Sequence, residues 1–157
     1  MYTWNEAVFH TKQEEAFRLA SEVDRWPELL PHYRSVKFLE GDSAKGGIVE
    51  MAAVRPFGRG LKWPVWWMSE MEIDAAESVV RYRHIRGVTK GMDVEWNLTN
   101  LGDEIIVTIV HKWNRPAIGV RAAADLIGNV FVHHIADRTL AGLKRAADKR
   151  AEVVQYG

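Results

Sequence analysis

No cysteine occurs among the 157 residues of the chain. This absence excludes disulfide bonds, thiolate metal sites and cysteine nucleophiles, and it suits a reducing compartment. The sequence also lacks any run of about 18 uninterrupted apolar residues, so no transmembrane helix is expected. The N-terminal residues show no basic region followed by an apolar run, which a signal peptide would need. These absences predict a soluble, cytoplasmic protein.

An excess of charge of either sign is missing as well. The 21 basic and 21 acidic residues give a net charge of zero, whereas nucleic-acid-binding proteins normally carry a basic excess. The adjacent residues His133 and His134 diverge on a helix, and no His-Glu-x-x-His pattern is present. Gly87 and Gly91 flank a turn without forming a phosphate loop. We therefore expect no nucleic-acid partner, no metal site and no cofactor.

The residues that are present fit one folded domain spanning 1–157. Apolar residues make up 47% of the chain and charged residues 27%, as in ordinary globular proteins. The seven tryptophans are unusual for this length, because each is large and carries a donor that needs a partner when buried. This number indicates an aromatic pocket wall or an interface.

Hydrophobic periodicity and turn signals predict the order of elements. Residues 2–10 read as a strand, and Thr11 with Glu14 has the spacing of a capping box that opens a helix ending near residue 25. Pro27 suits the first turn of a second short helix over 26–30. Pro64 indicates an edge position or a bulge. The further strands are expected at 36–40, 48–54, 61–73, 78–86, 92–100 and 104–113, and a long helix at 117–150.

This order predicts an α+β fold. A curved antiparallel sheet of about seven strands would wrap around the long C-terminal helix, with two short helices after the first strand. Alternation places one row of mostly apolar side chains on the inner face of the sheet and another on the helix, which predicts a cavity between them. The inward row is Trp67, Met71, Tyr82, His84, Trp96, Val107 and His111, with Phe131 on the helix.

One segment resembles a known superfamily. Asp24-Arg25-Trp26-Pro27-Glu28-Leu29-Leu30-Pro31-His32-Tyr33, running on through residues 36–41, resembles the region after the first strand in START-like and polyketide cyclase-like (SRPBCC, helix-grip) proteins. The 92–113 hairpin and the final helix extend the resemblance over nearly the whole chain. It implies a deep cavity between sheet and helix, which the superfamily uses in lipid carriers, quinone-binding proteins, plant hormone receptors and aromatase/cyclases.

The resemblance also implies roles for single residues. Tyr33 and Trp96 resemble a pocket tyrosine and a pocket tryptophan of the single-domain aromatase/cyclases. Those enzymes place arginines in the pocket to polarise a polyketide carbonyl. Here Met71 and His84 stand in these places, and methionine donates no hydrogen bond, while histidine is a weaker, pH-dependent donor. Whether the chain is an enzyme therefore stays open.

Three hypotheses remain. The first is a carrier or binding protein for an apolar or aromatic small molecule, such as a lipid, quinone or polyketide. The second is a polyketide cyclase or dehydratase in which Tyr33 and His84 act as acid and base. The third is a protein-interaction domain that contacts its partner through the Trp-rich hairpin. In any of the three, Phe57, Trp63 and Trp66 offer a surface for transient contact with a membrane or a protein. The expected ligand contacts are Tyr33, Trp67, Met71, Tyr82, His84, Trp96, Val107, His111 and Phe131.

Overall fold

The structure is a computed structural model that describes residues 1–56, 58–114 and 128–156, without the side chains of 128, 129 and 154–156. Phe57 and residues 117–127 of the expected C-terminal helix lie outside the described residues. The first half of the chain forms β1 (Tyr2–Phe9), α1 (Gln13–Ser21), the 3-10 turn η1 (Val23–Arg25), α2 (Trp26–Leu29), β2 (Tyr33–Asp42) and β3 (Gly46–Pro56). The second half forms β4 (Lys62–Asp74), β5 (Val79–Gly87), β6 (Asp93–Asn100), β7 (Ile105–Lys112), the π-helical turn η3 (Gly128–Val132) and α4 (His133–Tyr156).

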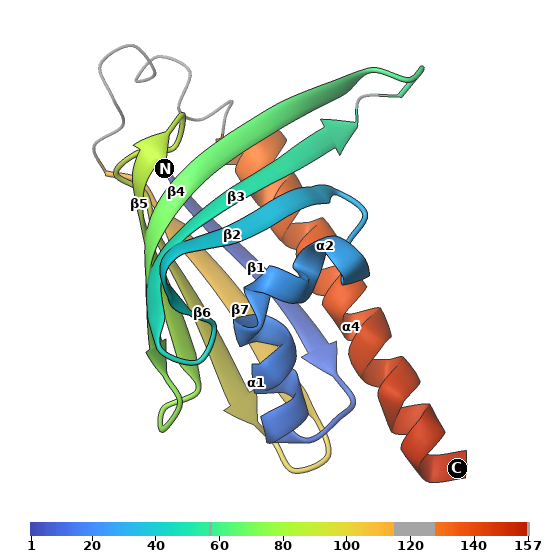
Figure 1. Cartoon of the computed structure of the whole chain (residues 1–157). Helices are drawn as coiled ribbons and strands as arrows, with labels where there is room; N and C mark the ends of the chain where they lie inside the picture. The colour runs from blue at the N-terminus through green and yellow to red at the C-terminus, as the bar shows by residue number, and fades with distance from the viewer. Residues whose placement is uncertain (57, 115–127, 157) are drawn as a thin grey trace.

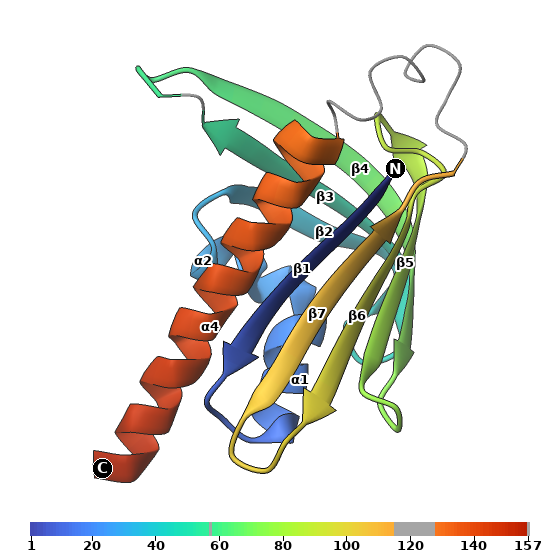
Figure 2. The same ribbon diagram turned by 180° about the vertical axis from the view of Figure 1, so that it is seen from behind.

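The seven strands form one antiparallel sheet in the order β1-β7-β6-β5-β4-β3-β2. Every pair joins chain neighbours except β1 with β7, which brings the start of the chain beside its last strand. The sheet curves, and α4 runs along its open side next to β1, with α1 and α2 beside it (Figures 1 and 2). The expected α+β architecture of a curved antiparallel sheet on a long C-terminal helix is thus confirmed.

The ends of several elements differ from the prediction. The capping box at Thr11 is wrong, because α1 begins only at Gln13 with Lys12 in the capping position and no side-chain bond to its first turn. Strand β2 begins at Tyr33 rather than at residue 36, directly after α2. The described part of the last helix opens with a π-helical turn and continues to Tyr156. No helix among the described residues is long and apolar enough to cross a membrane.

Strand β4 extends past its neighbour β5. Its pairing with β5 begins only at Trp67, opposite Gly87, whereas Pro64 pairs with Val54 of β3 on the other side. Pro64 therefore stands in an edge-like stretch, as predicted, where its missing N–H removes no bond to β5. Gly87 has a φ of +100°, and a Cβ there would lie 2.4 Å from the carbonyl oxygen of Trp66, so this position needs glycine.

Helix α1 fills one end of the space under the sheet. Its buried residues Ala16, Leu19 and Ala20 belong to the same apolar core as the inner faces of the strands. The Gln13 side chain donates hydrogen bonds to the Ser78 hydroxyl (2.7 Å) and to the carbonyl of Leu98 (3.5 Å), which fixes the helix against β5 and β6. The other end of the inner face is covered by α2 and α4 instead.

Candidate functional site

A cavity lies at this second end, between the inner face of the sheet, α2, η3 and α4. Its open volume is about 70 Å³. Among the residues that the structure describes, its lining contains no lysine, arginine, aspartate or glutamate. The lining consists of Trp26, Tyr33, Met51, Val65, Trp67, Tyr82, His84, Val88, Thr89, Met92, Val94, Trp96, Ile109, His111, Phe131, Val132, Ile135, Ala136 and Thr139.

Aromatic rings build one continuous wall of the cavity. The ring of Trp26 lies 5.4 Å from that of Trp96 and meets Tyr33 edge-on at 5.2 Å. Tyr33 in turn lies 6.2 Å from Trp67, and Trp67 stacks on His84 at 5.8 Å with an angle of 11° between the planes. Offset and edge-on contacts of this kind hold rings in fixed positions. These rings therefore pack into one wall through contacts with one another.

Contacts of the Thr139 hydroxyl on α4 fix the part of the cavity wall that contains Tyr33. The Thr139 hydroxyl donates to the carbonyl of Ile135 at 2.7 Å, lies 3.0 Å from His32 Nε2 and 3.4 Å from the Tyr33 hydroxyl. Because threonine has a single hydroxyl proton, its oxygen can accept a hydrogen bond from His32 when the proton is donated to Ile135. Burial raises the pKa of Tyr33 to about 12, so this phenol is uncharged at neutral pH.

The two histidines of the lining are uncharged as well. His84 Nδ1 lies 2.6 Å from the Thr89 hydroxyl, and His111 Nδ1 lies 3.2 Å from that of Thr3. Burial lowers the pKa of both His84 and His111 to about 3, since the imidazolium would lose its hydration. At neutral pH these rings are polar neighbours for a ligand rather than cations.

Tyr82 contributes a hydroxyl to the lining of the cavity. It is buried, and no hydrogen-bond partner exists for it among the described residues. Four other buried polar atoms share this condition, in Asn5, Gln13, Ser69 and His134, and none of those residues lines the cavity. Burial raises the pKa of Tyr82 well above its ordinary value, so its proton is retained.

The π-helical turn η3 positions the helix-side residues of the lining. Arg55 on β3 donates from Nε to the carbonyl of Val130 at 2.5 Å, which ties the turn to the β3–β4 hairpin. The next two residues, Phe131 and Val132, line the cavity. Trp63 on the hairpin lies 6.1 Å from the ring of Phe131, although 60% of its own surface is exposed. π-helical turns are frequent at functional sites.

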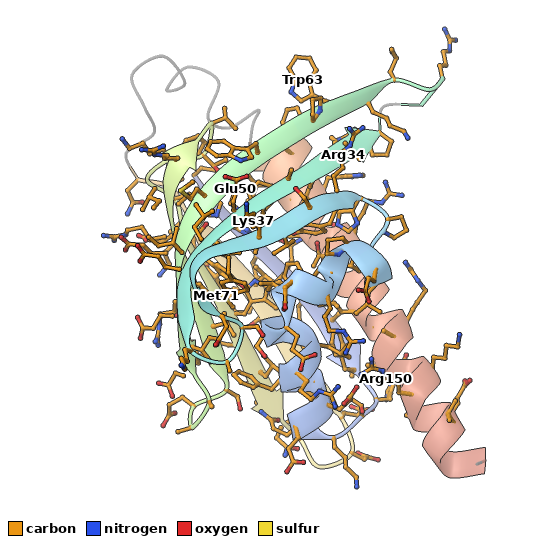
Figure 3. The ribbon with its side chains drawn as sticks, viewed as in Figure 1. Arg34, Lys37, Glu50, Trp63, Met71 and Arg150 are labelled. Carbon is orange, nitrogen blue, oxygen red and sulfur yellow. The ribbon has the colours of Figure 1, made fainter. Side chains whose placement is uncertain are left out.

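Most of the expected contact residues meet in this cavity: Tyr33, Trp67, Tyr82, His84, Trp96, His111 and Phe131. Met71 and Val107 do not. Both are buried in the core, but Met71 lies opposite Gly47 near the β2–β3 turn, and Val107 lies opposite Leu98 in the part of the sheet that α1 covers. Figure 3 shows Met71 far from Trp63 along the sheet. The inward-facing residues of the sheet therefore extend beyond the cavity.

Sequence reasoning missed two lining residues that organise the site. The sequence predicts a short helix at Trp26 but gives no direction for its side chain. Pro27 marks the start of this helix, and the helix directs Trp26 inward. Thr139 belongs to the C-terminal helix, where a single polar residue gives no pattern; only the fold shows that it bonds both Ile135 and His32.

Comparison with known proteins agrees with this architecture. A family described as polyketide cyclase / dehydrase and lipid transport matches residues 10–146. The chain belongs to this polyketide cyclase family. The superfamily resemblance of the segment from Asp24 to Tyr33 is thereby confirmed. No curated protein has a matching sequence.

Solved structures similar to this polyketide cyclase family member show the same fold. The Zhui aromatase/cyclase from Streptomyces has 15% identity and a TM-score of 0.73, covering 96% of this chain and 95% of its own. TTHA0849 from Thermus thermophilus has 18% identity and a TM-score of 0.71, covering 92% and 95%. A START superfamily protein from Mycobacterium smegmatis has 12% identity and a TM-score of 0.64, covering 92% and 98%.

Proposed function

We propose that this protein binds an apolar or aromatic small molecule in the cavity and acts as its carrier or binding protein. The observation that carries the proposal is the aromatic wall of Trp26, Tyr33, Trp67 and Trp96 around an open space whose described lining is uncharged. Ligand sites are typically concave, largely apolar and supplied with few polar groups, as this one is.

The size of the cavity limits the ligand. An open volume of about 70 Å³ is several times the roughly 10–15 Å³ that one water molecule needs. It suits one or two rings, or one end of a longer lipid, quinone or polyketide-like molecule. The apolar area that such a ring loses to the cavity contributes about 25 cal/mol per Å² to binding.

Native mass spectrometry tests the proposal. We expect gently purified protein to show an added mass that is released on denaturation as one apolar or aromatic compound. After removal of that compound, the protein should enhance the fluorescence of N-phenyl-1-naphthylamine until the sites are saturated. This probe is uncharged and joins a naphthyl group to a phenyl group. If the protein carries no small molecule and also fails to bind the probe, the proposal is wrong.

The enzymatic alternative, a polyketide cyclase or dehydratase using Tyr33 and His84, receives less support. Both residues line the cavity, and the family includes cyclases and dehydrases. However, a general acid or base works best with a pKa near the operating pH. The pKa of His84 is about 3 and that of Tyr33 about 12, so both rings stay neutral and neither exchanges protons readily at neutral pH.

A second surface supports a docking role beside ligand binding. The tip of the β3–β4 hairpin exposes Leu61 (66%), Trp63 (60%) and Trp66 (39%), and the cations Arg59 and Lys62 are exposed beside them. Figure 3 shows Trp63 on this projecting arm. Tryptophan favours the membrane interface, and lysine and arginine favour anionic lipids. We therefore propose that the hairpin rests on an anionic bilayer.

Vesicle sedimentation checks this role. We expect the protein to sediment with phosphatidylcholine vesicles that contain phosphatidylglycerol, and Trp63→Ser to reduce the bound fraction severalfold because the largest exposed apolar group of the tip is lost. Trp4→Ser is the matched control, since Trp4 is 52% exposed but lies on β1. Equal loss in both variants, or binding to a partner protein without any to vesicles, would contradict a membrane role.

A further inference from the structure

The buried hydroxyl of Tyr82 carries information about the ligand. Buried donors are nearly always hydrogen-bonded, and leaving one unsatisfied is unfavourable. Tyr82 is fully buried and lines the cavity, yet its hydroxyl has no partner among the described residues. A polar group of a bound molecule can supply that partner.

The surroundings of Tyr82 determine what that group can be. Tyr82 and His84 project from the same face of β5. An ionised Tyr33 would repel an ionised Tyr82, which raises the pKa of Tyr82 further. Both phenols keep their protons, and His84 is neutral. A neutral phenol donates a strong hydrogen bond to an oxygen acceptor, so the site offers donor capacity without a positive charge.

We propose that the ligand is an uncharged ring compound whose carbonyl or hydroxyl oxygen accepts a hydrogen bond from Tyr82. This inference rests on the proposed binding function and narrows it to neutral, oxygen-bearing aromatic or alicyclic molecules. The rings occupy the wall of Trp26, Trp67 and Trp96, while the oxygen lies among the polar side chains of the sheet.

Anionic ligands do not fit the same space. A carboxylate or phosphate buried without a cation loses its hydration and gains no compensating charge. The described lining provides no lysine or arginine, and the histidines that could have supplied a positive charge stay neutral. The described lining therefore disfavours free fatty acids and phospholipid head groups, whereas an uncharged chain end fits it.

Three compounds with one skeleton separate these contributions. Tetralin is the hydrocarbon, 1-tetralone adds a ketone oxygen, and tetralin-1-carboxylate adds a negative charge. NMR titration of the intact protein should give the tightest dissociation constant for 1-tetralone, about tenfold weaker binding for tetralin, and the weakest for the carboxylate. In Tyr82→Phe, we expect 1-tetralone to lose this advantage while the affinity for tetralin is unchanged or higher.

Matched variants identify the donor. Tyr2→Phe removes a hydroxyl from a residue that is 58% exposed on β1 and should change no affinity. Tyr33→Phe should preserve most of the ketone preference, because the Tyr33 hydroxyl already has Thr139 beside it. The inference is overturned if tetralin and 1-tetralone bind equally to the unmodified protein, if the preference survives in Tyr82→Phe, or if the carboxylate binds as tightly as the ketone. If none of the three compounds binds, the proposed function fails with it.

Discussion

The folded protein is expected to lose about 2 kcal/mol of stability for each of His84 and His111 when the pH falls from neutral to about 5. Burial lowers the pKa of both from 6.5 to about 3 in the folded state. Between these values the unfolded chain takes up protons that the folded protein excludes. The stabilisation is therefore complete above pH 6.5 and declines steadily as the pH falls toward 3.

Other ionisable groups add to this loss of stability at low pH, but the histidines account for the part above pH 5. The pKa of His32 is lowered to about 4 by burial and by the charge of Arg138, so His32 adds a loss in the same direction. The pKa values of Glu95 and Asp148 are also lowered, but these carboxylates affect stability mainly below their ordinary pKa values of 4.5 and 3.8. Stability lost between pH 6.5 and 5 therefore belongs to the histidines.

Urea denaturation at a series of pH values measures the effect. The free energy of unfolding should fall by several kcal/mol between neutral pH and about pH 5. Replacing His111 by Gln should remove about 2 kcal/mol of this fall, since one of the buried groups no longer titrates. His10→Asn removes a histidine from an exposed position and serves as the control. A free energy that stays constant over this range would show that the buried rings are hydrated or charged.

Substitution of Ala136 by Leu is expected to abolish ligand binding while the fold is retained. Ala136 lines the cavity from α4 and is 5% exposed. Leucine adds three carbon atoms at this point, and they enter the open space where we expect the rings of the ligand to lie. Because the added atoms enter existing space, the cost in stability should stay within the roughly 1–3 kcal/mol typical of overpacking.

The dissociation constant of N-phenyl-1-naphthylamine gives the readout, and circular dichroism verifies the fold. We expect affinity to fall by about tenfold or more in Ala136→Leu, equivalent to at least about 1.4 kcal/mol. Ala141→Leu places the same change on an exposed position of α4 and should bind normally, because alanine and leucine are both strong helix formers. Tight probe binding by Ala136→Leu would locate the ligand elsewhere.

The faces of the strands could be predicted from the sequence because one side of the sheet is buried. In β5 the alternation of Arg81 and Arg83 with Tyr82 and His84 leaves one register that hides the aromatic residues and exposes the charges. The structure follows this register, with Arg83 paired to Asp93 on the outer face. Period-two patterns thus place side chains on the inner face reliably.

Alternation does not say how far along a strand the cavity extends. Met71 and Val107 share the inner face with Trp67 and His111, yet they pack in the core. What separates the two groups is the position of α1. That position depends on tertiary contacts such as the hydrogen bonds from Gln13 to Leu98 on β6 and to Ser78 in the turn before β5. Thr139 bonds Ile135 within α4, but its contact with His32 likewise depends on the tertiary structure.

The stretch of β4 that extends past β5 leaves one row of backbone groups available on the side where its neighbour would be. Within the described residues, Lys62 to Trp66 pair with β3 alone. Such an edge can recruit a strand from another copy of the chain, and it lies next to exposed Trp63 and Trp66. Pro64 interrupts the row because it has no N–H to offer, and Lys62 adds a charge that resists close approach. Because Pro64 lacks a donor at this edge, the edge is a poorer template for a strand of another copy.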